Sequence, residues 1–460
     1  MLGIVLVALG VAAAAYLVLK RFYAPMALLM VGAALIVVMG FVTGEPVVTG
    51  KSATNTFTFD VVQVMTNLLK SRAAGLGMNI MVVAGFAAYM DRIGATKSLV
   101  NLCTKPLEKI HAPYVLLALA YVVGQLLNVF IPSATGLGML LMVTLFPLLV
   151  SQGVSKYSAA AAIATASALD LGPASGNSLL AAELSEIHVM EYFFDGQLPI
   201  AVVVLPLCAI AHAFLQRQFD IKDRALGRLT DADFTAQAVE VKGAAAQRTA
   251  YYALLPLLPV VLLFVFSKFV YAEVRLELIT AILFCCFTAF VVDLLTRRTP
   301  KEVVADTKAI FEGMGKVFTS TVILIICAEV FAEGLKRTGG IDAILTWASQ
   351  IEGAGGVAML LMMIGIMAVA SFVTGSGNAA FFAFSHFLPQ CAKSVAWETI
   401  VLAAPVQLAS GIARSMSPIS GVTMAVAGLA GISPFELVRR TLPVMVLALF
   451  LTILASVLFV

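Results

Sequence analysis

The sequence predicts an all-α polytopic membrane protein, built as an inverted repeat of two five-helix units. Three observations predict it: the composition, the apolar segments and the matches between the two halves. Of the 460 residues, 61% are hydrophobic and 12% are charged, whereas soluble domains are about half apolar and about a quarter charged. A soluble enzyme and a nucleic-acid-binding protein are therefore excluded. The net charge of +3 is too small to indicate a polyanionic partner.

The second observation is a series of apolar segments. About 20 apolar residues span the roughly 30 Å hydrocarbon core of a bilayer. Ten segments come close to that length: 2–19, 26–43, 73–90, 157–186, 198–215, 251–267, 277–296, 317–334, 398–430 and 443–460.

Two further apolar stretches, 116–150 and 357–392, are interrupted near their middles. The interruptions are 132–136 (PSATG) and 374–378 (TGSGN). They leave limbs of about 13–16 residues, which are too short to cross the hydrocarbon core. Non-helical backbone at membrane depth survives only where it lines a cavity or is buried in protein. We therefore expect two re-entrant hairpins, whose tips are candidate sites.

Two of the predicted spans are also broken. Segment 157–186 contains 172–177 (GPASGN), and segment 398–430 contains Gly411 and 414–421 (RSMSPISG). Proline removes a backbone donor and clashes with the preceding turn, while glycine permits an unwound stretch. Each half is therefore expected to hold one discontinuous helix.

The third observation is an ordered series of matches between the halves, at an offset of 242–245 residues. Residues 173–176 (PASG) match 418–421 (PISG), and 198–199 (LP) match 442–443 (LP). An odd number of crossings in each half turns the second copy upside down, as in many secondary transporters. The predicted units are an N-terminal repeat (1–215) with a cytoplasm-facing hairpin, a cytoplasmic linker (216–250) and a C-terminal repeat (251–460) with a periplasm-facing hairpin.

The distribution of positive charge predicts the orientation. If the N-terminus lies outside, the inner loops hold 20 of the 29 Lys and Arg residues and the outer loops hold eight. Cytoplasmic loops carry such an excess. We therefore expect a multi-pass protein of the bacterial inner membrane with both termini in the periplasm. The one remaining basic residue, Arg414, falls inside a membrane segment.

Arg414 needs a partner, because an unpaired charge at a helix centre costs about 2.5–3.5 kcal/mol on insertion scales. That partner is either a substrate carboxylate or a buried acid. Asp170 is the candidate acid, since the repeat offset of 245 places it at Ser415, beside Arg414. Asp170 is also the candidate coupling residue, with H⁺ or Na⁺ as the possible coupling ion.

Four segments mix charges with apolar residues and suit helices lying at the membrane surface: 57–70, 96–110, 301–316 and 338–350. A solvated loop explains 57–70 equally well.

The four breaks bring backbone N–H groups, half-helix ends and small polar side chains to one depth. Such groups bind small anions without requiring many full charges. The alternative is that Gly and Ser only let helices pack closely, but four clusters in two matching pairs favour a site. The candidate substrate-binding residues are Ser133, Thr135, Gly136, Ser175, Gly176, Asn177, Thr374, Gly375, Ser376, Gly377, Asn378, Arg414, Ser415, Ser417, Ser420 and Gly421.

Several motifs, some of them in the breaks described above, are spread over nearly the whole chain: 85–90 (GFAAYM), 133–138 (SATGLG) with 144–147 (TLFP), 173–176 (PASG), 374–378 (TGSGN) and 417–422 (SPISGV) with 432–436 (ISPFE). Together they resemble the DcuC-type anaerobic C4-dicarboxylate carriers. The resemblance implies transport of succinate, fumarate or malate by symport or antiport, in efflux or exchange across the inner membrane. It also implies kinship with the ion-transporter superfamily, whose members resemble homodimeric elevator carriers.

Two other functions remain open at this point. One is a carrier of the same build for another small organic anion. The other is a channel or a membrane enzyme. The repeat and the discrete polar clusters argue against a channel, which needs a continuous polar lining. Because no metal-ligand spacing or catalytic constellation is apparent in the sequence, we expect neither an enzyme nor a cofactor.

Overall fold

The computed structural model describes residues 2–20, 22–44, 46–235, 250–271, 273–274, 276–297, 299–340 and 355–459. None of these residues lies in a strand. Among them, seven helices are long and apolar enough to cross a membrane, or eight if the bent pair Phe57–Ala74 and Leu76–Arg92 counts as one span. The prediction of an all-α polytopic membrane protein is confirmed, with fewer unbroken spans than the ten apolar segments.

The first half contains two long helices, a bent pair, a short amphipathic helix, a helix pair, a broken helix and a long final helix. These are α1 (Leu2–Leu19), α2 (Ala24–Thr43), α3 (Phe57–Ala74), α4 (Leu76–Arg92), α5 (Ala95–Thr104), α6 (Pro113–Asn128), α7 (Ala134–Ser151), α8 (Lys156–Ala164), α9 (Gly176–Leu184), α10 (Val189–Glu191) and α11 (Leu198–Ala225).

The second half ends on the same order of pieces: a helix pair, a broken helix and a long final helix. Its helices are α12 (Leu258–Val265), α13 (Leu278–Thr296), α14 (Pro300–Asp306), α15 (Lys308–Val317), α16 (Ile323–Arg337), α18 (Gly355–Thr374), α19 (Gly377–Phe384), α20 (Leu388–Ser394), α21 (Thr399–Arg414), α22 (Gly421–Ala430) and α23 (Pro434–Phe459).

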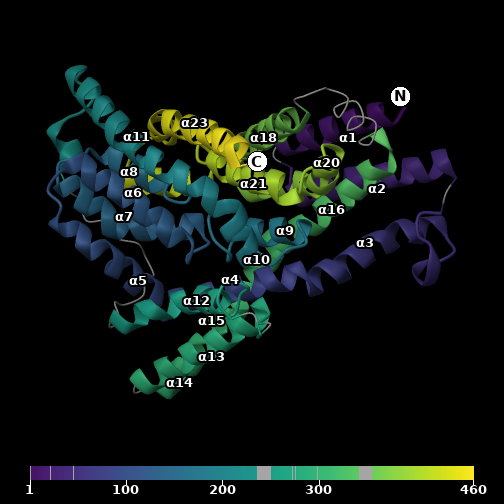
Figure 1. Ribbon diagram of the computed structural model, residues 1–460, viewed down its shortest axis with the longest axis horizontal. Coiled ribbons are helices and arrows are strands. Elements are labelled where there is room, and N and C mark those ends of the chain that lie inside the picture. Colours follow the sequence, from purple (N-terminus) through teal and green to yellow (C-terminus); the bar gives the residue numbers. More distant parts are fainter. Residues whose placement is uncertain are drawn as a thin grey trace.

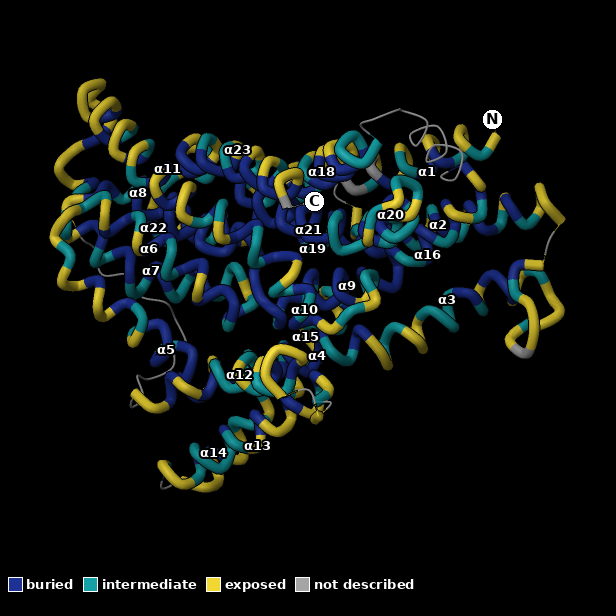
Figure 2. Tube along the Cα trace, viewed as in Figure 1, coloured by how far each residue is buried: buried dark blue, intermediate teal, exposed yellow. Residues whose placement is uncertain are grey.

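Helices from the two halves interleave. Helix α2 packs against α16, α4 against α15, α7 against α22 and α11 against α23. In Figure 1, α6, α7, α8, α11 and α23 gather on one side, α1 to α3 extend on the other, and α12 to α14 project below. Buried residues fill the central body, whereas the far end of α11 and much of α14 are exposed (Figure 2).

Helices α2 and α16 approach each other closely. A Cβ added to Gly32 would lie 2.6 Å from the backbone of Phe331. Only glycine therefore fits at this crossing, where small residues let membrane helices pack at short range.

Two predicted boundaries differ from the structure. Helix α11 continues past residue 215 to Ala225, and α23 begins at Pro434 rather than 443. The predicted segments stopped where charged residues begin, but in the fold these charged residues lie on the two helices and form ion pairs with each other. Arg440 on α23 binds Asp220 and Asp223 on α11, at 2.5 and 2.8 Å. Arg440, predicted in the loop 431–442, therefore lies on a helix and is buried, with 0% of its surface exposed.

The hairpin limbs also differ from the prediction. Helix α7 has 18 residues and α18 has 20, so both are long enough by length and composition to cross a membrane. In the first hairpin, α7 is longer than the predicted limb because it starts inside the predicted tip, where Ser133 caps it. In the second hairpin the helix runs through to Thr374, at the start of the predicted tip. Limb length alone therefore no longer distinguishes a re-entrant hairpin from a span.

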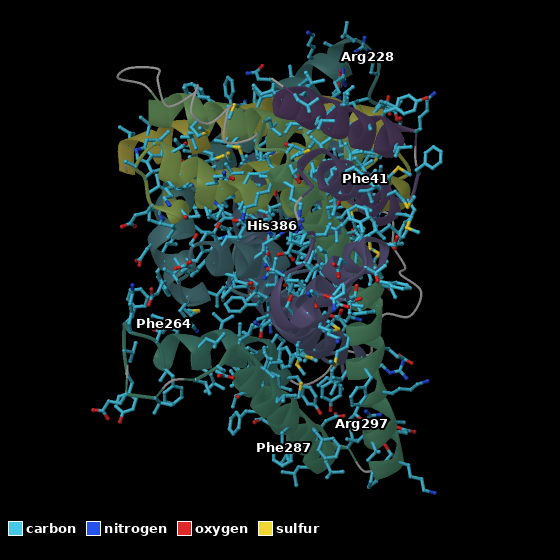
Figure 3. The ribbon with its side chains drawn as sticks, turned by 90° about the vertical axis from the view of Figure 1, so that its right-hand side faces the viewer. Phe41, Arg228, Phe264, Phe287, Arg297 and His386 are labelled. Carbon is cyan, nitrogen blue, oxygen red and sulfur yellow. The ribbon has the colours of Figure 1, made fainter. Side chains whose placement is uncertain are left out.

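The segments predicted at the membrane surface are largely helical. Residues 57–70 belong to α3, which meets α4 at a 42° bend next to Gly75, so the loop alternative is wrong. Segment 96–110 is α5 followed by the 3-10 turn Lys105–Lys109. Most of 338–350 lies outside the described residues. Figure 3 shows Arg228 and Arg297 at opposite extremities of the molecule and His386 between them.

Candidate substrate-binding site

Each of the four predicted breaks ends at a helix that a serine caps. Ser133, Ser175, Ser376 and Ser420 immediately precede α7, α9, α19 and α22. Their hydroxyls accept backbone N–H groups of the first turn at 3.1–3.3 Å. A serine cap satisfies one of the four unpaired N–H groups at a helix start. The remaining N–H groups and the helix dipole favour a bound anion.

The fold joins these breaks in pairs, each hairpin with the broken helix of the other half. At one junction Asn177 Nδ2 donates to Asn378 Oδ1 across the halves at 3.2 Å. Gly377, beside Asn378, packs closely on α21 of its own half, where a Cβ would lie 2.8 Å from the carbonyl oxygen of Ser410. At the other, a Cβ on Gly421 would lie 3.1 Å from Thr135 Oγ1. The predicted clusters thus come together across the halves.

Asp170 lies at the first junction, with a left-handed backbone (φ 48°). Its Oδ2 atom accepts hydrogen bonds from Ser175 Oγ and Asn177 Nδ2, each at 2.9 Å. Gln407 Nε2 donates to the same oxygen at 3.3 Å and to the Asp170 carbonyl at 3.1 Å. The Asp170 carboxylate is thus held in one orientation by Ser175 and Asn177 of the first half and by Gln407 on α21 of the second half.

Sequence reasoning missed two buried glutamines in this network. Gln197 Nε2 donates to Gln407 Oε1 at 2.7 Å and to Ser178 Oγ at 3.0 Å. Gln197 Oε1 accepts the backbone N–H of Gly172 at 3.1 Å. Both glutamines are 0% exposed. A polar side chain inside an apolar segment is costly, and that signal alone would have identified Gln407.

Arg414 ends α21 and reaches the break of the other half. Its Nη2 atom donates to the carbonyl oxygen of Ser167 at 2.8 Å. The ion pairs that the described residues form within 4.0 Å do not join it to Asp170. Its Nε atom is buried and has no hydrogen-bond partner among the described residues. Arg414 therefore forms no ion pair with Asp170, and its Nε atom can donate to another acceptor.

Three buried polar atoms of predicted site residues have no partner in the described part of the chain: Asn177 Oδ1, Arg414 Nε and Ser417 Oγ. An unsatisfied buried polar group costs about 1–3 kcal/mol, so native proteins rarely leave such groups unpaired. These three atoms can therefore form hydrogen bonds with a bound molecule or with water.

Other predicted residues serve mainly the backbone. The hydroxyl of Thr374 donates within its own helix, to Ala370 O at 2.8 Å, and that of Ser415 donates to Gly411 O at 3.0 Å. Gly375 has φ 68° and lies against Ile419, where a Cβ would approach to 2.9 Å. Among the remaining candidates, Gly136 supplies a backbone N–H to Ser133, and Gly176 lies in ordinary contact with Ile80 and Phe382.

Comparison with known proteins assigns the chain to a family. The model of the DcuC family, described as a C4-dicarboxylate anaerobic carrier, matches residues 2–460. The anaerobic C4-dicarboxylate transporter DcuC of Escherichia coli K12 is 36% identical over 463 residues, covering 100% of this chain and 96% of that protein. The probable anaerobic C4-dicarboxylate transporter DcuC of Vibrio cholerae is 36% identical over 450 residues, covering 97% and 96%.

A solved structure shares the fold. It is the YdaH transporter of Alcanivorax borkumensis, whose crystal structure is described as revealing an unusual topology. The TM-score is 0.56 at 15% sequence identity, and the match covers 94% of this chain and 98% of that one. At this identity the match establishes the likeness of fold alone.

Proposed function

Because the chain belongs to the DcuC family of C4-dicarboxylate anaerobic carriers, we propose that it moves succinate, fumarate and malate across the bacterial inner membrane as a secondary transporter. The family and its named members are transporters rather than enzymes. Efflux or exchange is the proposed direction, as the resemblance in sequence implies.

One observation carries this proposal: the unpaired polar atoms where the half-helices meet. Arg414 Nε and Ser417 Oγ are donors without acceptors in the described residues. A carboxylate supplies such acceptors, and an arginine fork binds it in a bidentate manner. We assign one substrate carboxylate to Arg414. The other carboxylate is assigned to the capped helix starts, whose N–H groups favour an anion.

The transport mechanism that we propose is an elevator. The two hairpins and the two broken helices contact each other across the halves, which supports their moving as one body. The remaining long helices form the scaffold, with 1–215 and 251–460 as inverted repeats joined by the linker 216–250. Both termini are placed in the periplasm, the carrier is a homodimer, and Asp170 couples transport to H⁺ or Na⁺.

Counterflow tests the function. Proteoliposomes preloaded with unlabelled fumarate should take up labelled succinate faster than empty ones, because a carrier returns faster with substrate bound. Preloading with lactate or citrate is the control for other organic anions. Acceleration by these anions alone would indicate another substrate class, and no acceleration by any of them would indicate a pore.

The second prediction concerns the amide pair at the first junction. Replacing Asn378 by alanine should weaken succinate binding by about 1–3 kcal/mol, because a donor to a charged oxygen is lost. The matched control is Asn67→Ala on α3, which removes an amide pair of the same kind (Gln63 Nε2 to Asn67 Oδ1, 2.9 Å) outside the site. Isothermal titration of the purified proteins measures both. Equal dissociation constants for the two variants would move the site away from Asn378.

A further inference from the structure

A cavity of about 520 Å³ separates the second hairpin from three helices of the rest of the molecule. Helices α18 and α19 form one wall, and α1, α2 and α16 form the other. Its floor includes Thr374, next to the tip of the hairpin. The cavity therefore lies in a seam between the hairpin and its neighbours, beside the candidate substrate site.

Water is a poor occupant of this cavity. By volume it has room for roughly 17 water molecules at about 30 Å³ each. Thr374 carries the only polar side chain among the residues lining it, and its hydroxyl already donates to Ala370 O at 2.8 Å. A buried water needs about two to four polar partners, and apolar cavities without them stay dry and bind apolar ligands. An apolar occupant is thus required to fill the seam.

The cavity has access to the surrounding lipid. Two of its lining residues, Ile366 and Val369 on α18, are 40% and 66% exposed. Helix α18 is itself apolar enough to cross the membrane, so this exposed face borders acyl chains. These chains are the apolar molecules that reach such a face.

Two segments that carry lysines meet beside one end of the cavity. Ala24 lines it there, and the hydroxyl of the preceding residue, Tyr23, donates to Thr319 O at 3.5 Å. That contact brings together two segments that carry the exposed lysines Lys20 and Lys316. A tyrosine with nearby lysines is typical of the headgroup region of a bilayer. Their charge complements a phosphate.

From these features we infer that the cavity binds an anionic phospholipid. One acyl chain fills the space between α18 and α1, α2 and α16, and the phosphate lies near Lys20 and Lys316. Gly365 lines this space, and a Cβ added there meets nothing within 4 Å, so a large side chain at this position would extend into the cavity. The lipid then packs against the hairpin that supplies Asn378. This inference is independent of which substrate the protein carries.

Native mass spectrometry of the purified full-length protein tests it, with phosphatidylglycerol and phosphatidylcholine of equal chain length added in competition. The wild type should retain one phospholipid per chain and prefer phosphatidylglycerol. Gly365→Phe should lose the lipid because its ring fills the cavity. Gly428→Phe on α22 is the matched control, since this helical glycine also has no neighbour within 4 Å and does not line the cavity.

Two further variants make the test decisive. Lys20→Gln with Lys316→Gln should abolish the preference for phosphatidylglycerol but keep a bound lipid. If Gly365→Phe fails to fold, Gly365→Leu replaces it, with size-exclusion chromatography as the check on folding. Equal lipid retention by the cavity-filling variant and the wild type would overturn the proposal. So would a change in dimer mass without a change in bound lipid, because a second copy would then cover this face.

Discussion

Replacing Arg414 by alanine should abolish binding of C4-dicarboxylates while the protein stays folded. The guanidinium reaches from α21 to the break of the other half, and its Nε atom lacks a partner among the described residues. A hydrogen bond to a charged group contributes about 1.5–3 kcal/mol, so losing a bidentate pair should weaken binding by roughly 100-fold or more. Arg414→Lys should be intermediate, since it keeps the charge and loses the planar fork. Titration of each purified variant with succinate measures the effect.

A matched arginine controls for the loss of charge alone. Arg224→Ala removes an exposed arginine, whose partner Asp231 is 94% exposed; such surface pairs contribute about 0–1 kcal/mol. Its affinity for succinate should equal that of the wild type. Intact affinity in Arg414→Ala would leave this residue only its structural contact with Ser167.

A double variant separates the two roles that the sequence left open for Arg414. If the arginine mainly neutralises Asp170, then Arg414→Gln combined with Asp170→Asn should bind succinate better than Arg414→Gln alone. If Arg414 holds the substrate, the double variant should bind as weakly as the single one. Binding is measured rather than transport, because Asp170 is also the candidate coupling residue.

The breaks were predictable because their causes are local. Pro173 and Pro418 lie in the non-helical stretches just before α9 and α22, where a proline and its flanking glycines favour a break. Helix α8 already ends at Ala164, and Gly411 lies inside α21. The serine caps are similarly local, since Ser175 and Ser420 bond to N–H groups two and three residues later. The positions of the breaks and of their serine caps were therefore predictable from the sequence.

The partners of these groups were not predictable, because tertiary packing chooses them. Gln407 binds Asp170 across 237 residues, and no pattern of apolar residues marks that contact. The end of α11 was missed for the same reason. Hydropathy treats Asp220 and Asp223 as the start of a loop, whereas in the fold an arginine on another helix compensates their charges.

That arginine, Arg440, is expected to be the most sensitive position for stability. It is 0% exposed, and it binds Asp220 Oδ1 at 2.5 Å and Asp223 Oδ2 at 2.8 Å. Removing one partner of a buried ion pair costs about 3–5 kcal/mol, since the other charge is left uncompensated. Arg440→Met should therefore lower the melting temperature far more than Arg224→Ala. Thermal unfolding in detergent, followed by size-exclusion chromatography, measures both.

The two acids should respond differently when they are neutralised in the Arg440→Met background. Asp223 also pairs with Arg439, at 2.5 Å, so it keeps a cation when Arg440 is lost. Within the described residues Arg440 is the only cation paired with Asp220. Adding Asp220→Asn should thus restore more stability than adding Asp223→Asn. Equal recovery, or a melting temperature of Arg440→Met no lower than that of Arg224→Ala, would show that the charges do not hold α11 to α23. Contacts between apolar side chains would then be what holds α11 against α23.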